Sequence, residues 1–136
     1  ADYLWSISSS FGPHTPEQWL ALTRPQLRPA PDGAGFVQHY DPAIALPLKA
    51  ITPEVAAAGE AFLWQCWDAL RCPVLLLRGA DSDLLSAATA QAMTERGPKA
   101  RLVSFPGVGH APTLVAPEQV EVVRGWLRRQ AGLETG

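Results

Sequence analysis

The apolar positions of this 136-residue chain change their pattern near residue 71. Beyond that point, residues 73–78 form a short, continuously apolar run, and residues 101–105 form a second predicted strand. Runs of this length are typical of parallel strands that are buried on both faces of a sheet. Between them, Ser86 is placed to cap a helix that Gly97 ends. The pattern therefore predicts a strand, a helix and a second strand.

A final helix is predicted to start at Pro117, because proline favours the first helical position. Val120, Val123 and Leu127 share one stripe of this helix, and Trp126 lies beside it. Burial of such side chains contributes roughly 1.5–3 kcal/mol each, so we expect the stripe to dock the helix on the sheet. This half of the chain should thus follow a β-α-β-α order with a right-handed crossover.

Residues 1–70 are rich in proline and tryptophan and carry little strand signal. Thr15, followed by Pro16 and by Gln18 three positions on, predicts the start of a helix with a capping box. Further short helices are predicted after Asp41 and after Thr52 and over residues 60–70, with a loop over residues 28–35. The chain as a whole is therefore predicted to be of the α/β class, with a mainly helical first part.

Two parallel strands do not make a stable sheet, because both edges and one face stay open. The sequence thus implies more strands than it contains. We expect the open strand edge to pair either with the upstream half of a larger fold or with another copy of this chain.

Composition narrows the classes of partner. The formal net charge of −2 argues against nucleic acid or an anionic membrane as a partner. No apolar stretch approaches the ~20 residues that cross a bilayer. Cys66 and Cys72 fit no zinc or redox spacing, which suggests a reducing, cytoplasmic setting. His14 and His39 have no partner at metal-ligand spacing, and we predict no metal site.

Candidate chemistry follows both predicted strands. The first runs into Gly79-Ala80-Asp81-Ser82-Asp83, and the second into Gly107-Val108-Gly109-His110. In an open α/β sheet, the loops at the carboxyl ends of the strands form the rim of the active site. A carboxylate on the first loop can accept the Nδ1 proton of His110, which leaves Nε2 as a base. Alone, such a histidine is usually a surface residue and such an aspartate a turn former. Their matched positions predict two members of a nucleophile–His–acid triad.

Residues 73–86 and 105–114 resemble the C-terminal half of the α/β-hydrolases, and residues 39–45 are similar to the region before the acid strand in one bacterial subgroup. The resemblance implies that residues 1–70 form a helical lid or connecting segment and residues 71–136 the C-terminal half of the core. Many members place the acid three residues after the loop glycine, where this chain has Ser82. We prefer the next residue, Asp83, as the acid, with Asp81 as the alternative.

The family order is nucleophile, acid, histidine, and its nucleophile lies in a Gly-x-Ser-x-Gly turn. No such motif occurs in this chain. Ser10 is the nearest match, but Pro13 and Pro16 interrupt the helix that should follow it. We therefore leave the nucleophile unassigned and interpret Ser10 as part of a loop at a helix end.

The resemblance implies hydrolysis of a small-molecule ester, lactone, amide or carbon–carbon bond on an upstream nucleophile, without metal or organic cofactor. The chain alone should then have little or no activity. Trp64 and Trp67 are candidates for an apolar substrate pocket, although burial against the core is the favoured interpretation. The alternative function is a non-catalytic interaction module that recruits a partner by β-addition to its strand edge.

Overall fold

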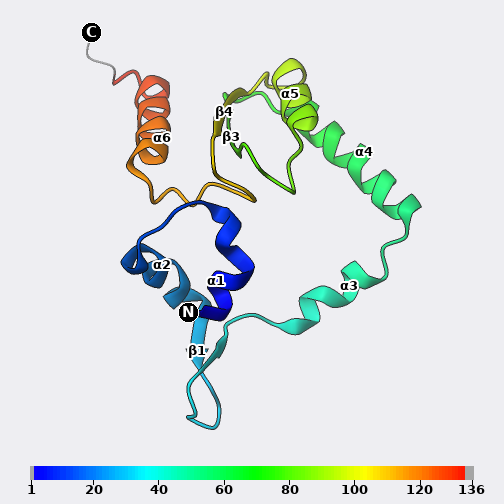
Figure 1. Ribbon diagram of the computed structural model, residues 1–136. Helices are drawn as coiled ribbons and strands as arrows, with labels where there is room; N and C mark the ends of the chain where they lie inside the picture. Colours follow the sequence, from blue (N-terminus) through cyan, green and yellow to red (C-terminus); the bar gives the residue numbers. More distant parts are fainter. Residues whose placement is uncertain (1, 134–136) are drawn as a thin grey trace.

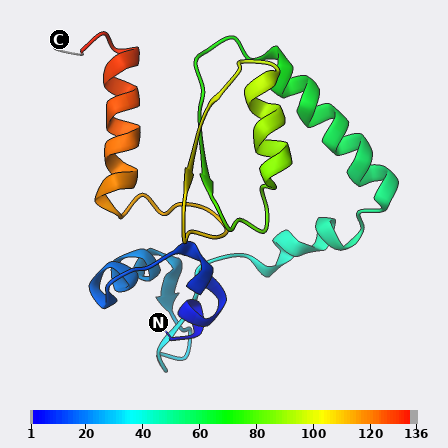
Figure 2. The same ribbon diagram turned by 45° about the horizontal axis from the view of Figure 1, so that its top comes forward.

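The computed structural model describes residues 2–133 and shows a mixed α/β chain (Figure 1). Strands β3 (Leu75–Gly79) and β4 (Arg101–Phe105) are parallel, with Leu75 opposite Arg101 and Gly79 opposite Phe105. Helix α5 (Ala87–Glu95) connects them, and helix α6 (Pro117–Gln130) follows. The predicted β-α-β-α order is confirmed. In Figure 2, α6 lies on one side of the strand pair and α5 on the other.

The caps of α5 explain its length. The Ser86 hydroxyl accepts a hydrogen bond from the Thr89 amide at 3.0 Å, which satisfies an amide that the first helical turn leaves unpaired. At the other end, Gly97 has a φ of +59°, a conformation that glycine adopts without the penalty of a side chain. Both signals were visible in the sequence, and both lie within two residues of the observed helix ends.

Helix α6 presents a different face to the chain from the one that the apolar stripe predicted. Val120 is 41% exposed and Leu127 is 54% exposed, whereas Gln119 is only 4% exposed. The Gln119 side chain accepts a hydrogen bond from the Leu114 amide at 2.8 Å. The Gln119 side of the helix thus faces the chain, while Val120 and Leu127 lie toward solvent. The expectation that the stripe docks the helix was therefore wrong for these two residues.

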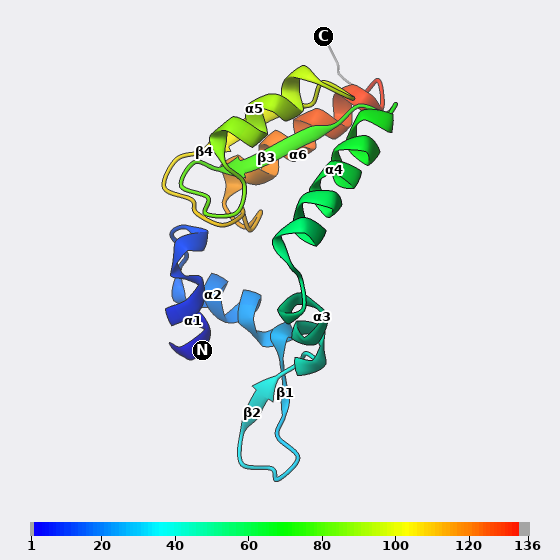
Figure 3. The ribbon, with the colours of Figure 1, turned by 90° about the vertical axis from the view of Figure 1, so that its right-hand side faces the viewer.

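The first part of the chain is mainly helical, as predicted, but it also contains a hairpin (Figure 3). Its elements are α1 (Asp2–Ser8), α2 (Pro16–Thr23), β1 (Leu27–Pro29), β2 (Phe36–Gln38), α3 (Ala45–Lys49) and α4 (Pro53–Ala69), with 3₁₀ turns at Ser9–Phe11, Arg24–Gln26 and Pro42–Ile44. The capping box of Thr15 and Gln18 is present, and α2 ends before Pro25 as expected.

Two expectations for this part were wrong in part. Of the loop expected over residues 28–35, residues 30–35 are confirmed, but residues 28 and 29 belong to β1, which pairs with β2. These two strands are too short for an alternating pattern to reveal. The helices expected after Thr52 and over residues 60–70 are one continuous helix, α4. Gly59 does not interrupt α4, because a single glycine costs a helix only about 1 kcal/mol relative to alanine.

Candidate active site

The ends of β3 and β4 bring the two predicted loops into direct backbone contact. The Ala80 amide donates to the Phe105 carbonyl at 2.9 Å, and the Asp81 amide donates to the Val108 carbonyl at 3.0 Å. Gly79 makes this approach possible, because a Cβ there would lie 2.3 Å from the carbonyl oxygens of both Val108 and Gly109. The acid loop (residues 79–83) and the histidine loop (residues 107–113) are therefore packed against each other at the carboxyl ends of the strands.

The structure places Asp83 next to His110. Oδ1 of Asp83 lies 3.2 Å from Nδ1 of His110, at the long end of hydrogen-bond distances. The Asp83 side chain is 71% exposed and that of His110 is 37% exposed. Within residues 2–133, Asp81 approaches the histidine loop through its backbone, with no contact found between its carboxylate and the His110 ring. Of the two candidate acids, Asp83 is thus the one that contacts the imidazole.

Ser82 holds the two loops together through its side chain. Its hydroxyl donates to the carbonyl of His110 at 2.8 Å and accepts from the amides of Leu84 and Leu85 at 3.3 and 3.1 Å. This serine occupies the position at which many α/β-hydrolases carry the acid. Sequence reasoning assigned it no role, although its place between Asp81 and Asp83 was a usable signal.

Ser10 also reaches the histidine loop, but through its backbone. The Gly109 amide donates to the Ser10 carbonyl at 2.5 Å, and the ring of Phe11 meets the His110 imidazole edge to face, with centroids 4.9 Å apart. Ser10 lies in the 3₁₀ turn that follows α1, and α2 starts only at Pro16. Sequence reasoning missed Phe11, since nothing in the local pattern connects it with a residue that lies about a hundred positions later.

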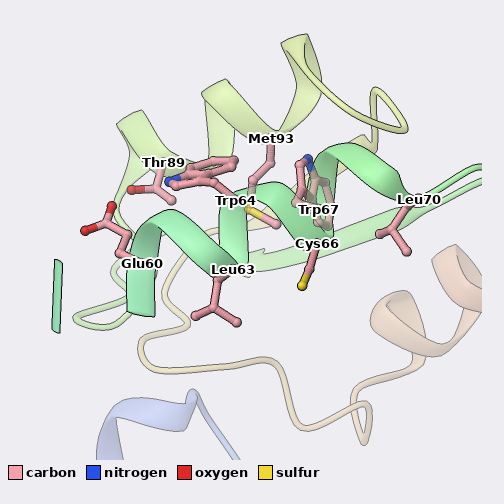
Figure 4. A pocket seen from close by; sticks show the side chains of 8 residues that line it. All are labelled: Glu60, Leu63, Trp64, Cys66, Trp67, Leu70, Thr89 and Met93. Carbon is pink, nitrogen blue, oxygen red and sulfur yellow. The ribbon is translucent and has the colours of Figure 1, made fainter. Parts of the chain in front are cut away.

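Trp64 and Trp67 lie at the other end of the sheet from His110. Both side chains are half-buried and line an apolar groove between α4 and α5 (Figure 4). The Trp67 carbonyl would lie 2.7 Å from a Cβ on Gly97, which precedes β4, whereas His110 follows β4. A strand of this length spans roughly 16 Å. These tryptophans therefore pack between two helices, and the structure does not bring them to the Asp83–His110 pair.

Arg96 joins the two helices around these tryptophans. Its guanidinium makes a two-point contact with the Asp68 carboxylate, in which Nε lies 2.8 Å from Oδ1, and it lies 4.4 Å from the centroid of the Trp64 ring. The Trp67 indole donates to the Arg96 carbonyl at 3.2 Å. Hydrogen bonds from Arg96 hold the pKa of the Asp68 carboxyl below its usual value.

The lowered pKa of Asp68 predicts a pH-dependent contribution to stability. A carboxyl whose pKa is lower in the folded state stabilises the fold above its unfolded value, about pH 4, and loses this effect as pH falls through the folded value. Asp68→Asn should therefore lower the urea midpoint at about pH 6 and approach the wild type at about pH 3. Glu60→Gln, on the same helix, is the control. A wild-type advantage that stays constant over this range contradicts the prediction.

Residues 2–133 contain no group of three or more histidine, cysteine, aspartate or glutamate side chains arranged to hold a metal ion. No helix in this range is long and apolar enough to cross a membrane.

Comparisons with known proteins identify the family of the chain. The sequence profile of the alpha/beta hydrolase family matches residues 2–123. The chain is 49% identical over 122 residues to the 3-hydroxybutyrate-oligomer hydrolase of Cupriavidus necator, a match that covers 88% of this chain and 42% of that protein. It is 38% identical over 88 residues to a pimeloyl-(acyl-carrier protein) methyl ester esterase of Aromatoleum aromaticum, covering 57% of this chain and 35% of that protein.

The fold is also found among solved structures. The crystal structure of an alpha/beta hydrolase from Novosphingobium aromaticivorans matches with a TM-score of 0.73 and 35% identity, over 94% of this chain and 44% of that one. The chain therefore belongs to the alpha/beta hydrolase family. It spans between 35% and 44% of the length of these relatives.

Proposed function

We propose that this chain is the C-terminal portion of an α/β-hydrolase that cleaves carboxylic esters, and that it supplies the acid and the histidine of the triad. The observation that carries the proposal is the contact between Asp83 Oδ1 and His110 Nδ1 at the ends of two parallel strands. The ester class is supported by the relatives, one of which is named as a methyl ester esterase and another as a 3-hydroxybutyrate-oligomer hydrolase.

The chemistry follows from the tautomer that the Asp83 contact favours. Asp83 accepts a hydrogen bond from the Nδ1–H group, so the lone pair of His110 lies on Nε2, which takes the proton of the nucleophile hydroxyl as its oxygen bonds to the ester carbon. Nε2 then gives this proton to the leaving alcohol. A water molecule then loses a proton to Nε2 and attacks the carbonyl carbon of the acyl intermediate. The carboxylic acid product leaves, and Nε2 returns the proton to the oxygen of the nucleophile.

In this proposal the nucleophile comes from an upstream half of the fold that also covers the open side of the sheet. Within residues 2–133, β3 and β4 pair only with each other. The side chains of β3 before Gly79 are only half-buried. A parallel sheet whose strands are apolar on both faces needs more cover than this. The upstream half would pair with the free edge of β3 and reduce this exposure.

A chimera tests the function directly. This chain replaces the matched region of the Cupriavidus necator hydrolase, where 49% identity favours a compatible interface. Release of 3-hydroxybutyrate from its oligomers and hydrolysis of p-nitrophenyl butyrate are measured, with the unaltered relative as positive control. Activity supports the proposal. A chimera that folds and binds the oligomer but hydrolyses neither ester supports the non-catalytic interaction module instead.

The chimera also separates the two candidate acids. We expect Asp83→Asn to lower kcat about a thousandfold, because the neutral amide carries no negative charge to stabilise the imidazolium and its NH2 group can donate to Nδ1, which favours the wrong tautomer of His110. Asp81→Asn is the matched control and should stay within about twofold of the parent, since its contact with the histidine loop is made by its backbone amide. The opposite result would assign the acid to Asp81.

A further inference from the structure

We propose that residues 10–14 form a brace that positions the imidazole of His110, and that His14 is the positioning residue that pins this brace to the histidine loop. The catalytic meaning of the brace rests on the proposed function. Its existence depends only on contacts within this chain, which can be tested without an assay of activity.

The brace contacts the histidine loop at successive residues. The Ser10 carbonyl accepts from the Gly109 amide at 2.5 Å. The Phe11 ring meets the His110 ring at an interplanar angle of 66°, an edge-to-face arrangement that aromatic pairs favour. Gly12 has a φ of +106°, and a Cβ there would lie 3.1 Å from a side-chain carbon of the loop. Residues 10–12 thus contact residues 108–110 through both backbone and side-chain atoms.

His14 closes the brace on the far side of His110. Its Nδ1 lies 2.8 Å from the Gly12 carbonyl, and its Nε2 lies 2.8 Å from the Thr113 hydroxyl. Because a carbonyl oxygen only accepts hydrogen bonds, Nδ1 carries the proton, and in the neutral ring Nε2 accepts from Thr113. Thr113 lies three residues beyond His110. The His14–Thr113 bond therefore holds the segment that contains Phe11 against the loop that contains His110.

The imidazole of His110 needs such a support because its contact with Asp83 is weak, although the Ser82 hydroxyl holds the His110 carbonyl. Its contact with Asp83 is 3.2 Å long, and both side chains are substantially exposed, so water competes for the hydrogen bond. Its φ of 22° lies in a region that residues other than glycine rarely adopt. Surrounding contacts must maintain this conformation. The edge of Phe11 restrains the imidazole itself, and the Ser10–Gly109 bond restrains the backbone that carries it.

The test uses nuclear magnetic resonance on the isotope-labelled 136-residue chain. In His14→Ala, we expect the Gly109 amide to exchange with solvent about tenfold faster. The His110 ring protons should also lose the shift caused by the Phe11 ring. His14→Gln should retain both signals, because the amide oxygen can accept from the Thr113 hydroxyl. His39→Ala, at an exposed position, is the matched control and should change neither.

Thr113→Val tests the other partner of the His14–Thr113 hydrogen bond. It removes the hydroxyl at nearly constant volume, and it should reproduce the changes expected in His14→Ala. The amides of β3 and β4 report on the fold as a whole and should keep their protection. Unchanged His110 and Gly109 signals in both variants would overturn the proposal. So would equal loss of protection in the strands, or unfolding of both variants, since His14 would then serve general stability.

In the active chimera, loss of the brace is expected to change kcat and not KM. His14→Ala should lower kcat about tenfold and leave KM unchanged, because a misplaced base slows proton transfer more than it weakens binding. His14→Gln should restore most of the rate. If the parent chimera is inactive, the proposed function fails, while the resonance experiment still decides whether the brace exists.

Discussion

Replacing His110 with alanine is expected to lower ester hydrolysis by the chimera about a thousandfold or more. The imidazole is the only group proposed to take the proton from the nucleophile and return it to the leaving alcohol, and a positioned acid–base group of this kind contributes about 10²–10⁴-fold. The loss should appear in kcat, because the imidazole acts on the transition state and not on substrate binding. The initial rate of p-nitrophenyl butyrate hydrolysis measures it.

His39→Ala is the matched control for this experiment, since it removes a histidine that lies outside the candidate site. It should retain the parent rate within about twofold. Circular dichroism of both variants shows whether the fold is kept. A His110→Ala chimera that is folded and retains a tenth or more of the parent activity would show that another residue is the base.

Replacing Gly79 with alanine is expected to give the largest loss of stability. The added Cβ would lie 2.3 Å from the carbonyl oxygens of Val108 and Gly109, and backbone oxygens cannot rotate away as a side chain can. The histidine loop must move, which breaks the bond between the Asp81 amide and the Val108 carbonyl. We expect a loss of about 3 kcal/mol in the free energy of unfolding. Urea denaturation of the chain, followed by circular dichroism, measures it.

Gly59→Ala is the control for the same substitution in open space. A Cβ at this position meets nothing within 4 Å, and the residue lies inside α4. Alanine is favoured over glycine in a helix by about 1 kcal/mol, so this variant should be as stable as the wild type or more so. If Gly79→Ala had the urea midpoint of the wild type, the result would contradict the close packing of Gly79 against the backbone of Val108 and Gly109.

Local signals predicted much of the β-α-β-α part because each of its boundaries is set within a few residues. The strand β3 is recognisable from the apolar run over residues 73–78, and Ser86 caps α5 through an amide only three residues away. The order of elements then brings Asp83 and His110 to one edge of the sheet, since parallel strands end on the same side. This much of the candidate site followed from pattern and topology.

Local pattern failed where a distant residue decides the outcome. The apolar stripe of α6 indicated Val120 as a buried position, but the side of the helix that carries Gln119 faces the chain instead, and Gln119 accepts a hydrogen bond from the Leu114 amide. The strands β1 and β2 are each three residues long, which is too short for periodicity to distinguish from a loop.

The helix caps, the two parallel strands and the positions of the acid and histidine loops can be predicted from the sequence, because they depend on neighbouring residues. The contact of Asp83 with His110, the bond from Ser82 to the His110 carbonyl and the packing of Phe11 against the imidazole arise from contacts between distant segments. The His14–Thr113 bond joins residues 99 positions apart. No local propensity encodes such a contact, since it forms only when packing brings both segments to the same place.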